Sequence, residues 1–546
     1  MTTRKPRQPN RPLKRPVNKR QRRYAADRRH EDIEQLLHGA APTFSCLHLE
    51  EPTLIFGGNR TSVDPKEGLE LFGPVSASAQ PLRVGVIGTA EGINAFRNLL
   101  ERTRHPISPG LGSRGTPLDP LCFPPFPGTD ASFRTRFETD TSFQRDIPLR
   151  LFEQAVRTAK TTDKLRNVVK LVVEKLGTLK DLEPEPDVVA VVLPECVQDE
   201  CEIVGATFRF RPLRSTRAER LERSLNRDRK KGQMLLRLQL TLEETGSPDD
   251  RGFWNIHHAL KAHAMATGLP TQMVWETTLT GRSQNQDPAT VAWNLFTALY
   301  YKGGRIPWNL ASVPASTCFV GISFYKEAPV PRAPLHTSLA QVFSGYGEGI
   351  VLKGGRALID ETKGDRKPHL CGPDAEELLK RALKTYLDHH KTIPPERVVI
   401  HKTSRFWPEE VEGFKRALGS IPRFDFVTLE RLGDRFMRLG YEPPLRGTVI
   451  SLEAHRHVVF TSGYIPHLRT YPGHRIPNPM EIVEHHGDSS VETLCREIMA
   501  LTKLNWNSCA FASLEPITIQ FARTIGRILT EIPEGAPVQN KYRFYM

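Results

Sequence analysis

The sequence predicts an α/β protein with two successive sheets. Two apolar runs in the first half, 83–88 and 187–193, are typical of strands, and helical patterns lie beside them. A third apolar run, 316–325, begins a second group of strands that includes a long helical pattern. A length of 546 residues is enough for two to four domains, each with its own core.

In the first half, the elements follow one another as in a wound sheet. The strand 83–88 leads into a helix-like stretch at 92–102, which makes a first β-α step. Residues 106–127 are crowded with proline and glycine and are expected to form a long surface loop. A helical pattern runs from 149 to 176, and the valine run within 187–193 predicts a strand buried on both faces.

A strand followed by glycines can also bind a dinucleotide. The fingerprint requires G-x-G-x-x-G, whereas Gly85, Gly88 and Gly92 stand at spacings of three and four. No acidic residue ends a second strand about twenty residues later, as the motif requires. The pattern favours structural glycines over an NAD site.

The second half begins with the strand 316–325. Further strands are expected near 349–353, 397–401 and 447–452, with a helix over 373–389 among them. This order of a strand meander, a helix and more strands indicates a second α/β domain.

Four polar residues fall at spacings suited to one terminal phosphate. His257 and Lys261 are four apart on a helical pattern, so their side chains leave the same face. Gln272 follows a Gly-Leu-Pro break, and Lys302 ends the helical pattern 289–301. Two cations, an imidazole and an amide could surround one anion. The alternative for His257 is a histidine of the core.

Composition limits the class of protein. No apolar run approaches the ~20 residues of a membrane span, and no apolar signal-peptide core opens the chain, so we expect a cytoplasmic protein. Of the eight cysteines only Cys196 and Cys201 lie near each other. A single C-x4-C pair favours reduced, structural thiols over a zinc site.

The net charge of +14 is concentrated at the N-terminus. Residues 1–30 hold twelve Lys or Arg and one Asp, a net charge of +11, which leaves +3 for the rest. Such a segment cannot bury apolar surface and is expected to be disordered in isolation. Two alternatives stay open for it: an arm that holds nucleic acid or an acidic partner by charge, and a solvated leader with no specific role.

These motifs together resemble the Argonaute proteins. The run from His257 to Gln272 followed by Y-Y-K-G-G-R-I-P-W is similar to the pocket that holds the 5′-phosphate of a guide strand. Upstream, 51–58, 64–66 and 71–74 look like the opening of a short prokaryotic Argonaute. The resemblance extends from about residue 50 to the end.

The resemblance implies a Rossmann-like MID domain followed by an RNase H-like PIWI domain. We therefore expect four parts: a basic disordered tail (1–45), an N-terminal segment (46–77), the MID domain that binds the guide 5′ end (78–314) and the PIWI domain (315–546). Residues 47–74 are a candidate surface for docking an effector protein.

The chain departs from slicing Argonautes at three positions. Where the family carries catalytic carboxylates or a histidine, this sequence has Ser323, Thr403 and Arg523. Two-metal cleavage needs several carboxylates around cations about 4 Å apart, so we expect binding without cleavage. The acidic residues Asp360, Glu361 and Asp365 have basic neighbours, which favours a solvated charge patch over a replacement site.

The resemblance also suggests ligands at the guide 5′ end. The carboxylate of Met546 and the side chain of Gln272 are candidate ligands of a structural Mg²⁺, because hard cations bridge carboxylate and phosphate oxygens. The alternative is an apolar C-terminus that only packs on the core. Arg305 is a further candidate for a guide phosphate.

The implied function is guided recognition without cleavage. We expect a short 5′-phosphorylated guide, RNA by family analogy, that pairs with single-stranded target DNA. The output would come from an APAZ-domain effector, a sirtuin-like or TIR NAD hydrolase or a nuclease, bound as a heterodimer or a higher oligomer. The biology would be antiviral and antiplasmid defence by abortive infection. The alternatives are an active guided nuclease and a general nucleic-acid-binding scaffold that uses the basic tail.

Overall fold

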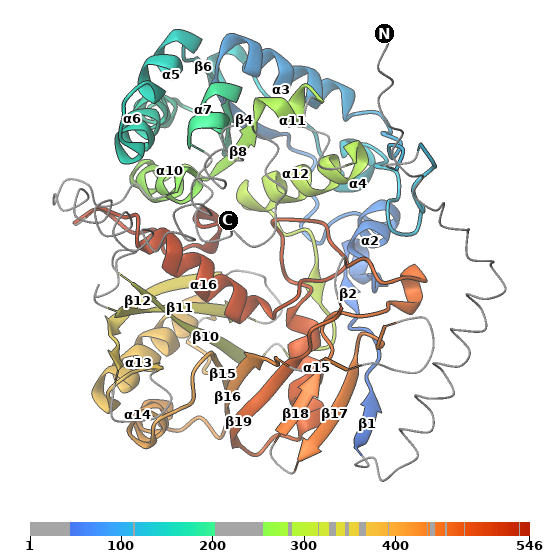
Figure 1. The fold of residues 1–546 in the computed structure, drawn as a ribbon, viewed down its shortest axis with the longest axis vertical. Coiled ribbons are helices and arrows are strands. Elements are labelled where there is room, and N and C mark those ends of the chain that lie inside the picture. Colours follow the sequence, from blue (N-terminus) through green and yellow to red (C-terminus); the bar gives the residue numbers. More distant parts are fainter. Residues whose placement is uncertain are drawn as a thin grey trace, which may run out of the picture. The chain divides into compact units, whose positions relative to one another are not determined.

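Figure 1 shows the computed structural model of the chain. It describes residues 44–112, 115–201, 255–281, 287–314, 316–326, 335–343, 349–359, 367–390, 392–433, 435–436, 443–453, 456–473, 476–533 and 535–546. Residues 1–43 of the predicted basic tail lie outside this set. The chain divides into two compact units, 1–46 and 47–546, and the following description concerns the second. No helix of the described residues is long and apolar enough to cross a membrane.

The first sheet is parallel, and its strands follow the order β5-β4-β7-β8, with β6 also paired to β4. This confirms the two strands predicted in the first half. The strand β8, which carries Gln272, was not predicted. The strands are β4 (Leu82–Gly88), β5 (Phe137–Glu138), β6 (Gln144–Asp146), β7 (Val188–Leu193) and β8 (Thr271–Trp275).

The central strand β7 is buried on both faces, as its valine run predicts. Val188, Ala190 and Val192 belong to a core shared with α3 (Ala90–Arg102) and α12 (Pro288–Lys302). The alternate residues Val189, Val191 and Leu193 belong to a second core shared with α5 (Leu149–Val156), α6 (Thr161–Lys180) and α10 (Ile256–Ala264). The period-two alternation of a strand thus places helices on both faces of the sheet.

One sequence prediction was wrong in its extent. The helical pattern over 149–176 is two helices, because Lys160 has extended backbone angles between α5 and α6. The break lets α5 pack against α6, so both helices bury their apolar faces in one core. The predicted loop at 106–127 is confirmed for its described residues, which form only isolated bridges and turns.

The second sheet is mixed, with the order β17-β18-β19-β16-β15-β10-β11-β12. The strands β10, β15 and β16 are parallel, and the other neighbours are antiparallel. Their bounds are β10 (Thr317–Lys326), β11 (Leu335–Phe343), β12 (Gly349–Arg356), β15 (Arg397–Lys402), β16 (Arg423–Arg431), β17 (Thr448–Glu453), β18 (Arg456–Val459) and β19 (Met480–Gly487).

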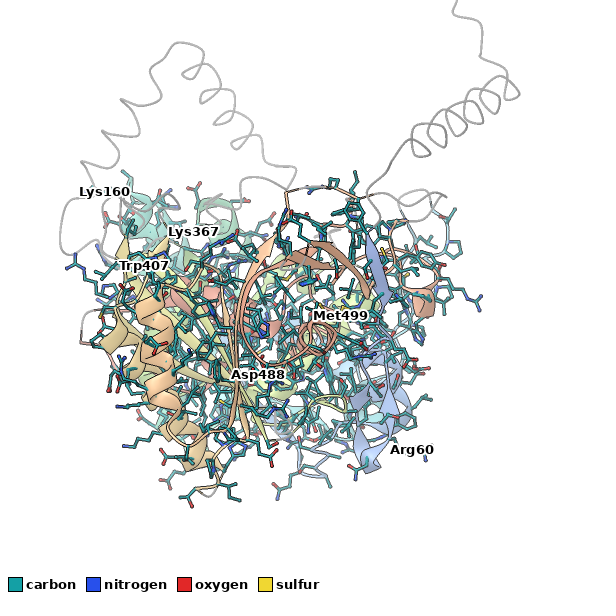
Figure 2. All side chains as sticks on the ribbon, turned by 90° about the horizontal axis from the view of Figure 1, so that it is seen from below. Arg60, Lys160, Lys367, Trp407, Asp488 and Met499 are labelled. Atoms are coloured by element: carbon teal, nitrogen blue, oxygen red, sulfur yellow. The ribbon has the colours of Figure 1, made fainter. Side chains whose placement is uncertain are left out.

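Helices cover this sheet on both faces (Figure 1). Cys318, Val320 and Ile322 of β10 share a core with α13 (Gly372–His389) and α14 (Pro408–Leu418). Phe319, from the opposite face, lies in the core that contains α16 (Ile517–Leu529). The helix α15 (Val491–Leu501) shares a core with residues of β16 and β19. Its Met499, labelled in Figure 2, is fully buried.

The N-terminal segment is part of this folded body. It forms β2 (Leu54–Ile55), β3 (Thr61–Ser62) and α2 (Pro65–Phe72), and β2 also pairs with β9 (Asn309–Leu310). Leu54, Phe56 and Leu69 are at most 1% exposed. Next to β9, the buried indole of Trp308 donates a hydrogen bond to the Lys503 carbonyl at 2.9 Å, which ties the two sheets together.

Candidate functional site

The helix α10 positions two of the predicted residues. Its N-cap is Asn255, whose side-chain oxygen accepts hydrogen bonds from the backbone N–H groups of His257 and His258 at 3.0 and 3.1 Å. Lys261 is four positions after His257 in the helix, so both lie on one face. His257 is half-buried, whereas Lys261 is only 2% exposed.

The strand β8 meets this face of α10. The ammonium group of Lys261 donates a hydrogen bond to the backbone carbonyl of Thr271. The next residue is Gln272, whose side-chain N–H donates to the Met273 carbonyl at 3.0 Å and leaves its oxygen as an acceptor. The parallel register with β7 holds Gln272 opposite Ala190, on the edge strand β8 of the first sheet.

The helix α12 delivers Lys302 to the same place. It begins at an Asp287 N-cap with Pro288 in the first turn, and Lys302 is its last residue. Lys302 is 1% exposed, and its ammonium group donates to the side-chain oxygens of Gln272 and, at 3.3 Å, Asn507. The structure therefore brings together the four residues that the sequence singled out. We call His257, Lys261, Gln272 and Lys302 the lysine pocket.

The two lysines are close enough to affect each other's protonation. Burial lowers the pKa of Lys261 to about 7, against which a hydrogen bond with Lys302 acts. Burial, and then the charge of Lys261, lower the pKa of Lys302 well below its usual range. Burial, and then Lys261, also lower the pKa of His257 far below normal. An anion in this pocket would relieve the repulsion, so its chemistry suits a phosphate group.

Arg305 does not join the lysine pocket. Its guanidinium donates hydrogen bonds to the hydroxyl of Thr135 and the carbonyl of Gln80, both at 2.7 Å, and lies over the Tyr300 ring. These partners of Arg305, Thr135, Gln80 and Tyr300, are not residues of the lysine pocket. A contact between Arg305 and a guide phosphate stays a prediction.

The C-terminus lies beside the two helices of the lysine pocket (Figure 1). Met546 is 3% exposed and belongs to the same buried core as Ala262 of α10 and Tyr301 of α12. The predicted second magnesium ligand, Gln272, already gives its oxygen to the Lys302 ammonium. A magnesium ion held by Met546 and Gln272 stays a prediction.

Asn507 is a pocket residue that the sequence reasoning missed. It lies in the loop after α15, and three contacts attach this loop to α12: Asn507 to Lys302, the Trp506 ring to that of Tyr301 at 4.7 Å, and the Cys509 N–H to the Asn294 oxygen at 2.9 Å. In the sequence, Asn507 is marked only by the short polar and aromatic run Asn505-Trp506-Asn507. Its contact with Lys302 joins residues 205 positions apart, and such a contact leaves no periodic pattern in the sequence.

The three positions without catalytic carboxylates are on β10 (Ser323), directly after β15 (Thr403) and on α16 (Arg523). Ile322 of β10 pairs with Lys402 of β15, so Ser323 and Thr403 directly follow the last parallel pair of these two strands. Arg523, on α16, donates to both carboxylate oxygens of Glu515 at 2.6 and 2.7 Å. Among the described residues, no group of three or more His, Cys, Asp or Glu could hold a metal ion. Asp360, Glu361 and Asp365 lie outside the described residues.

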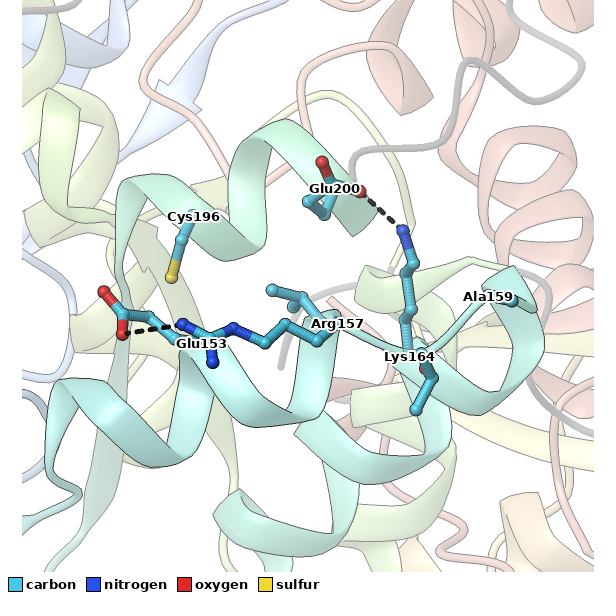
Figure 3. A pocket seen from close by; sticks show the side chains of 8 residues that line it. Glu153, Arg157, Ala159, Lys164, Cys196 and Glu200 are labelled. Carbon is cyan, nitrogen blue, oxygen red and sulfur yellow. Dashed lines mark hydrogen bonds and ion pairs between the residues drawn. The ribbon is translucent and has the colours of Figure 1, made fainter.

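A separate polar cavity of about 570 Å³ lies among α5, α6 and α7 (Glu195–Cys201), and Figure 3 shows it from close by. Its charges are paired: Lys164 contacts Glu200 at 2.5 Å, and Arg157 contacts Glu153 at 4.0 Å. Since each cation already has a carboxylate, this cavity is a poorer anion site than the lysine pocket.

The chain is similar to known proteins in fold and, over part of its length, in sequence. No family model matches the chain. A search of curated proteins finds the Argonaute protein of Aquifex aeolicus (strain VF5), 22% identical over 294 residues, which are 53% of this chain and 38% of that protein. Clostridium butyricum Argonaute bound to a guide DNA and a 19-mer target DNA superposes with a TM-score of 0.57 and 14% identity, over 90% of this chain and 54% of that one. For Drosophila Piwi the TM-score is 0.55 with 13% identity, over 95% of this chain and 61% of that one.

The chain is similar in fold to Argonaute proteins, and over about half of its length it is also similar in sequence to one of them. Its fold matches the MID-PIWI architecture of these proteins, and we call the part that contains the parallel sheet MID and the part that contains the mixed sheet PIWI. The chain spans between 38% and 61% of the length of these proteins. In these terms, the lysine pocket belongs to MID, and Asn507 reaches it from PIWI.

Proposed function

We propose that this chain is a short prokaryotic Argonaute that binds the 5′-phosphate of a guide strand in the lysine pocket. One observation carries the proposal: Lys261 and Lys302 are buried together, and their hydrogen-bond acceptors are a backbone carbonyl and two side-chain amides. Two buried cations without an anion are costly, and a phosphate monoester is the anion that a guide strand offers.

The guide is proposed to be a short RNA that pairs with single-stranded target DNA. Base pairing would supply the sequence specificity, while the protein holds the guide backbone and its 5′ end. The likeness to an Argonaute bound to a guide and a target supports guided binding in general. The choice of RNA rests on the resemblance to short prokaryotic Argonautes.

We propose that target binding is not followed by cleavage. The proposal is supported by the uncharged neighbours Ser323 and Thr403 and by Arg523, which is held by Glu515. A two-metal site needs carboxylates at such positions, and a serine, a threonine and an arginine cannot replace them. The output would then come from a partner, an APAZ-domain effector that depletes NAD or degrades nucleic acid, in cytoplasmic defence against plasmids or phage.

Magnesium is part of the proposal only for the loaded protein. Of the two predicted magnesium ligands, Met546 and Gln272, only Met546 offers a carboxylate. Phosphate oxygens of the guide would therefore have to complete the coordination shell of the ion. A bound cation would screen neighbouring phosphates from one another. Chelation by EDTA should then weaken binding of a 5′-phosphorylated guide more than binding of the same strand with a 5′-hydroxyl.

The first test is the nucleic acid that copurifies with the protein. A narrow population of short, ribonuclease-sensitive strands with 5′-phosphates is expected, and it should be lost in the Lys261→Ala/Lys302→Ala double variant. Lys164→Ala is the matched control, because Lys164 is also a buried MID lysine but lies outside the pocket. Circular dichroism establishes that both variants fold.

Two other outcomes would support the alternatives. Heterogeneous nucleic acid that disappears on deletion of residues 1–30 and survives the double variant would indicate a general binder that uses the basic tail. Target strands cut by the loaded protein in Mg²⁺ or Mn²⁺ would indicate an active nuclease and would contradict the proposal of binding without cleavage.

A further inference from the structure

Three parallel strands of the second sheet end at one edge, and two of them lead into arginines. The strands β10, β15 and β16 are parallel, so their carboxyl ends share this edge, and open α/β sheets bind ligands there. Ser323 and Thr403 directly follow the last parallel pair of β10 and β15. Arg431 is the last residue of β16, and the exposed Arg405 follows β15 in the loop before α14. Cations therefore accompany the two uncharged side chains at this edge.

A third arginine reaches Arg431 from the helix α16. Arg523 donates through Nη1 to both carboxylate oxygens of Glu515, at 2.6 and 2.7 Å, and Arg431 donates through Nε to the same carboxylate at 2.9 Å. The side chain of Glu515 is 9% exposed, whereas those of the two arginines are each 41% exposed. A buried carboxylate thus holds two guanidinium groups together at the surface. We call Arg405, Arg431 and Arg523 the arginine cluster.

The arginine cluster keeps hydrogen-bond donors for a further acceptor. A guanidinium group has five N–H donors in a planar fork. Within the described part of the chain, Arg431 donates only through Nε and Arg523 only through Nη1, and the Arg405 guanidinium makes no hydrogen bond or ion pair. The remaining N–H groups have the fork geometry that binds two oxygens of one phosphate.

The charges at this edge of the sheet also favour an anion. Lys367 donates to Glu430 and neutralises it. Glu484 is turned inward, where it accepts from the Phe406 N–H at 2.8 Å and from the Thr428 hydroxyl at 3.1 Å. The three arginines outnumber Glu484 and the Glu515 carboxylate that two of them share. A positive charge is left over, so a single phosphodiester group matches the cluster in charge as well as in geometry.

We propose that the arginine cluster binds phosphodiester groups of the target strand in the guide-loaded protein. This inference rests on the proposed function, because the target strand is present only when a guide pairs with it. Metal ions would neutralise a phosphate in a two-metal nuclease, whereas here fixed guanidinium groups would neutralise it and retain the strand uncut. Since contacts to phosphates carry no sequence information, the cluster would strengthen the binding of every paired target alike.

The test is the affinity of the guide-loaded protein for a complementary single-stranded DNA, measured by fluorescence anisotropy at several salt concentrations. The guide is a synthetic 5′-phosphorylated RNA. Arg405→Gln and Arg523→Gln should each weaken target binding by about tenfold, the loss expected for one hydrogen bond to a charged group. Each variant should also reduce the slope of log affinity against log salt by about 0.7–1, because one phosphate contact is lost.

Two comparisons separate phosphate binding from folding. Arg405→Gln should leave the thermal denaturation curve unchanged, since Arg405 has no carboxylate partner among the described residues. Arg496→Gln is the matched control: Arg496 is half-exposed and paired with Glu492, but its neighbour Glu497 contacts Arg397, the first residue of β15, at the opposite end of the parallel strands. Its target affinity and salt slope should equal those of the wild type.

The affinity for the guide alone assigns each result to a strand. Unchanged guide affinity with weakened target binding supports the inference. Unchanged target binding in both variants would overturn it and leave the proposed function standing. Weakened guide binding with normal target binding would place the phosphate on the guide and overturn the assignment to the target. Equal affinity of the wild type for guides with a 5′-phosphate and a 5′-hydroxyl would overturn the proposed function itself.

Discussion

The side-chain oxygen of Asn507 lies 3.3 Å from the ammonium nitrogen of Lys302. The first residue belongs to the PIWI part of the chain and the second to the MID part, so the lysine pocket is completed across the two sheets. Trp506 and Cys509 attach the same loop to α12. A change in the packing of PIWI against MID would therefore be felt directly at the proposed guide 5′ end.

The pH dependence of the free energy of unfolding should show that Lys261 is buried without an anion beside it. The pKa of Lys261 is about 7 in the folded protein and about 10.4 in an unfolded chain. Between these values the unfolded state binds more protons, so this lysine makes the protein more stable as the pH rises. Relative to Lys261→Met, the wild-type free energy of unfolding should rise by up to about 1.4 kcal/mol per pH unit.

Urea denaturation of the guide-free proteins at pH 7, 8 and 9 measures this difference. Lys170→Met is the control, because Lys170 is an exposed residue of α6, and its profile should run parallel to that of the wild type. Parallel profiles for Lys261→Met as well would mean that Lys261 keeps its proton in the folded protein.

Glu410 neutralises the buried Lys402 and should be needed for stability. Its carboxylate accepts from the Lys402 ammonium at 2.6 and 2.7 Å and from the backbone N–H groups of Leu370 and Trp407. Glu410→Gln leaves a buried ammonium group without its anion, so the free energy of unfolding should fall by about 3 kcal/mol. Glu412→Gln, an exposed change on the same helix, should cost at most about 0.5 kcal/mol.

The sequence predicted those parts of the fold whose signals are local. The valine run of β7 indicated a strand buried on both faces, and the spacing of His257 and Lys261 indicated a shared helix face. The break between α5 and α6 was missed, because residues 157–160 contain neither glycine nor proline. Packing of α5 on α6, rather than a breaker residue, determines where the helix ends.

Longer-range features could not be predicted in this way. The strand β19 reads M-E-I-V-E-H-H-G, which is polar for a strand of a central sheet. Its polar residues are satisfied by neighbours: Glu484 accepts from the Phe406 N–H at 2.8 Å, and His485 contacts Asp425 at 2.7 Å. Asn507 was missed for the same reason, since its partner is distant in the sequence and no periodicity connects them.

Glu51 should hold the N-terminal segment to PIWI. Its carboxylate contacts Arg446 at 3.0 Å and Lys503 at 2.9 Å. Burial raises the pKa of Glu51, but the two cations outweigh it and leave the pKa lowered. Glu51→Gln should reduce the free energy of unfolding by about 3 kcal/mol at pH 7. Glu50→Gln, at the exposed neighbour, should change it by at most about 0.5 kcal/mol.

Glu51→Gln and its control Glu50→Gln also test how the contribution of Glu51 to stability changes with pH. The pKa of Glu51 is lower in the folded protein than in the unfolded chain, where it is about 4.3. The contribution of Glu51 to the free energy of unfolding is therefore complete above the pKa of the unfolded chain, and it is lost as the pH falls through the pKa of the folded protein. Denaturation at pH 7 and pH 4 should therefore show a smaller difference between wild type and Glu51→Gln at the lower pH. A difference that grows on acidification would contradict this assignment.

Gly321 should be essential for the contact between β10 and α16. A Cβ atom at this position would lie 2.1 Å from the Thr518 carbonyl oxygen, so Gly321→Ala has to push α16 away from the sheet. We expect a loss of about 3 kcal/mol in the free energy of unfolding. Gly177→Ala is the matched control: it lies inside α6 with no atom within 4 Å of the new methyl group, so it should stabilise the protein by about 0.5–1 kcal/mol.

The effect of Gly321→Ala should also reach the lysine pocket. The buried Glu531, just beyond α16, accepts a hydrogen bond from the backbone N–H of Asn255 at 2.9 Å, and Asn255 caps the helix that carries His257 and Lys261. Displacement of α16 should therefore loosen the start of α10 and weaken binding of a 5′-phosphorylated guide, measured under conditions in which the variant is folded. A destabilised variant with unchanged preference for the 5′-phosphate would mean that the pocket is independent of how α16 packs on PIWI.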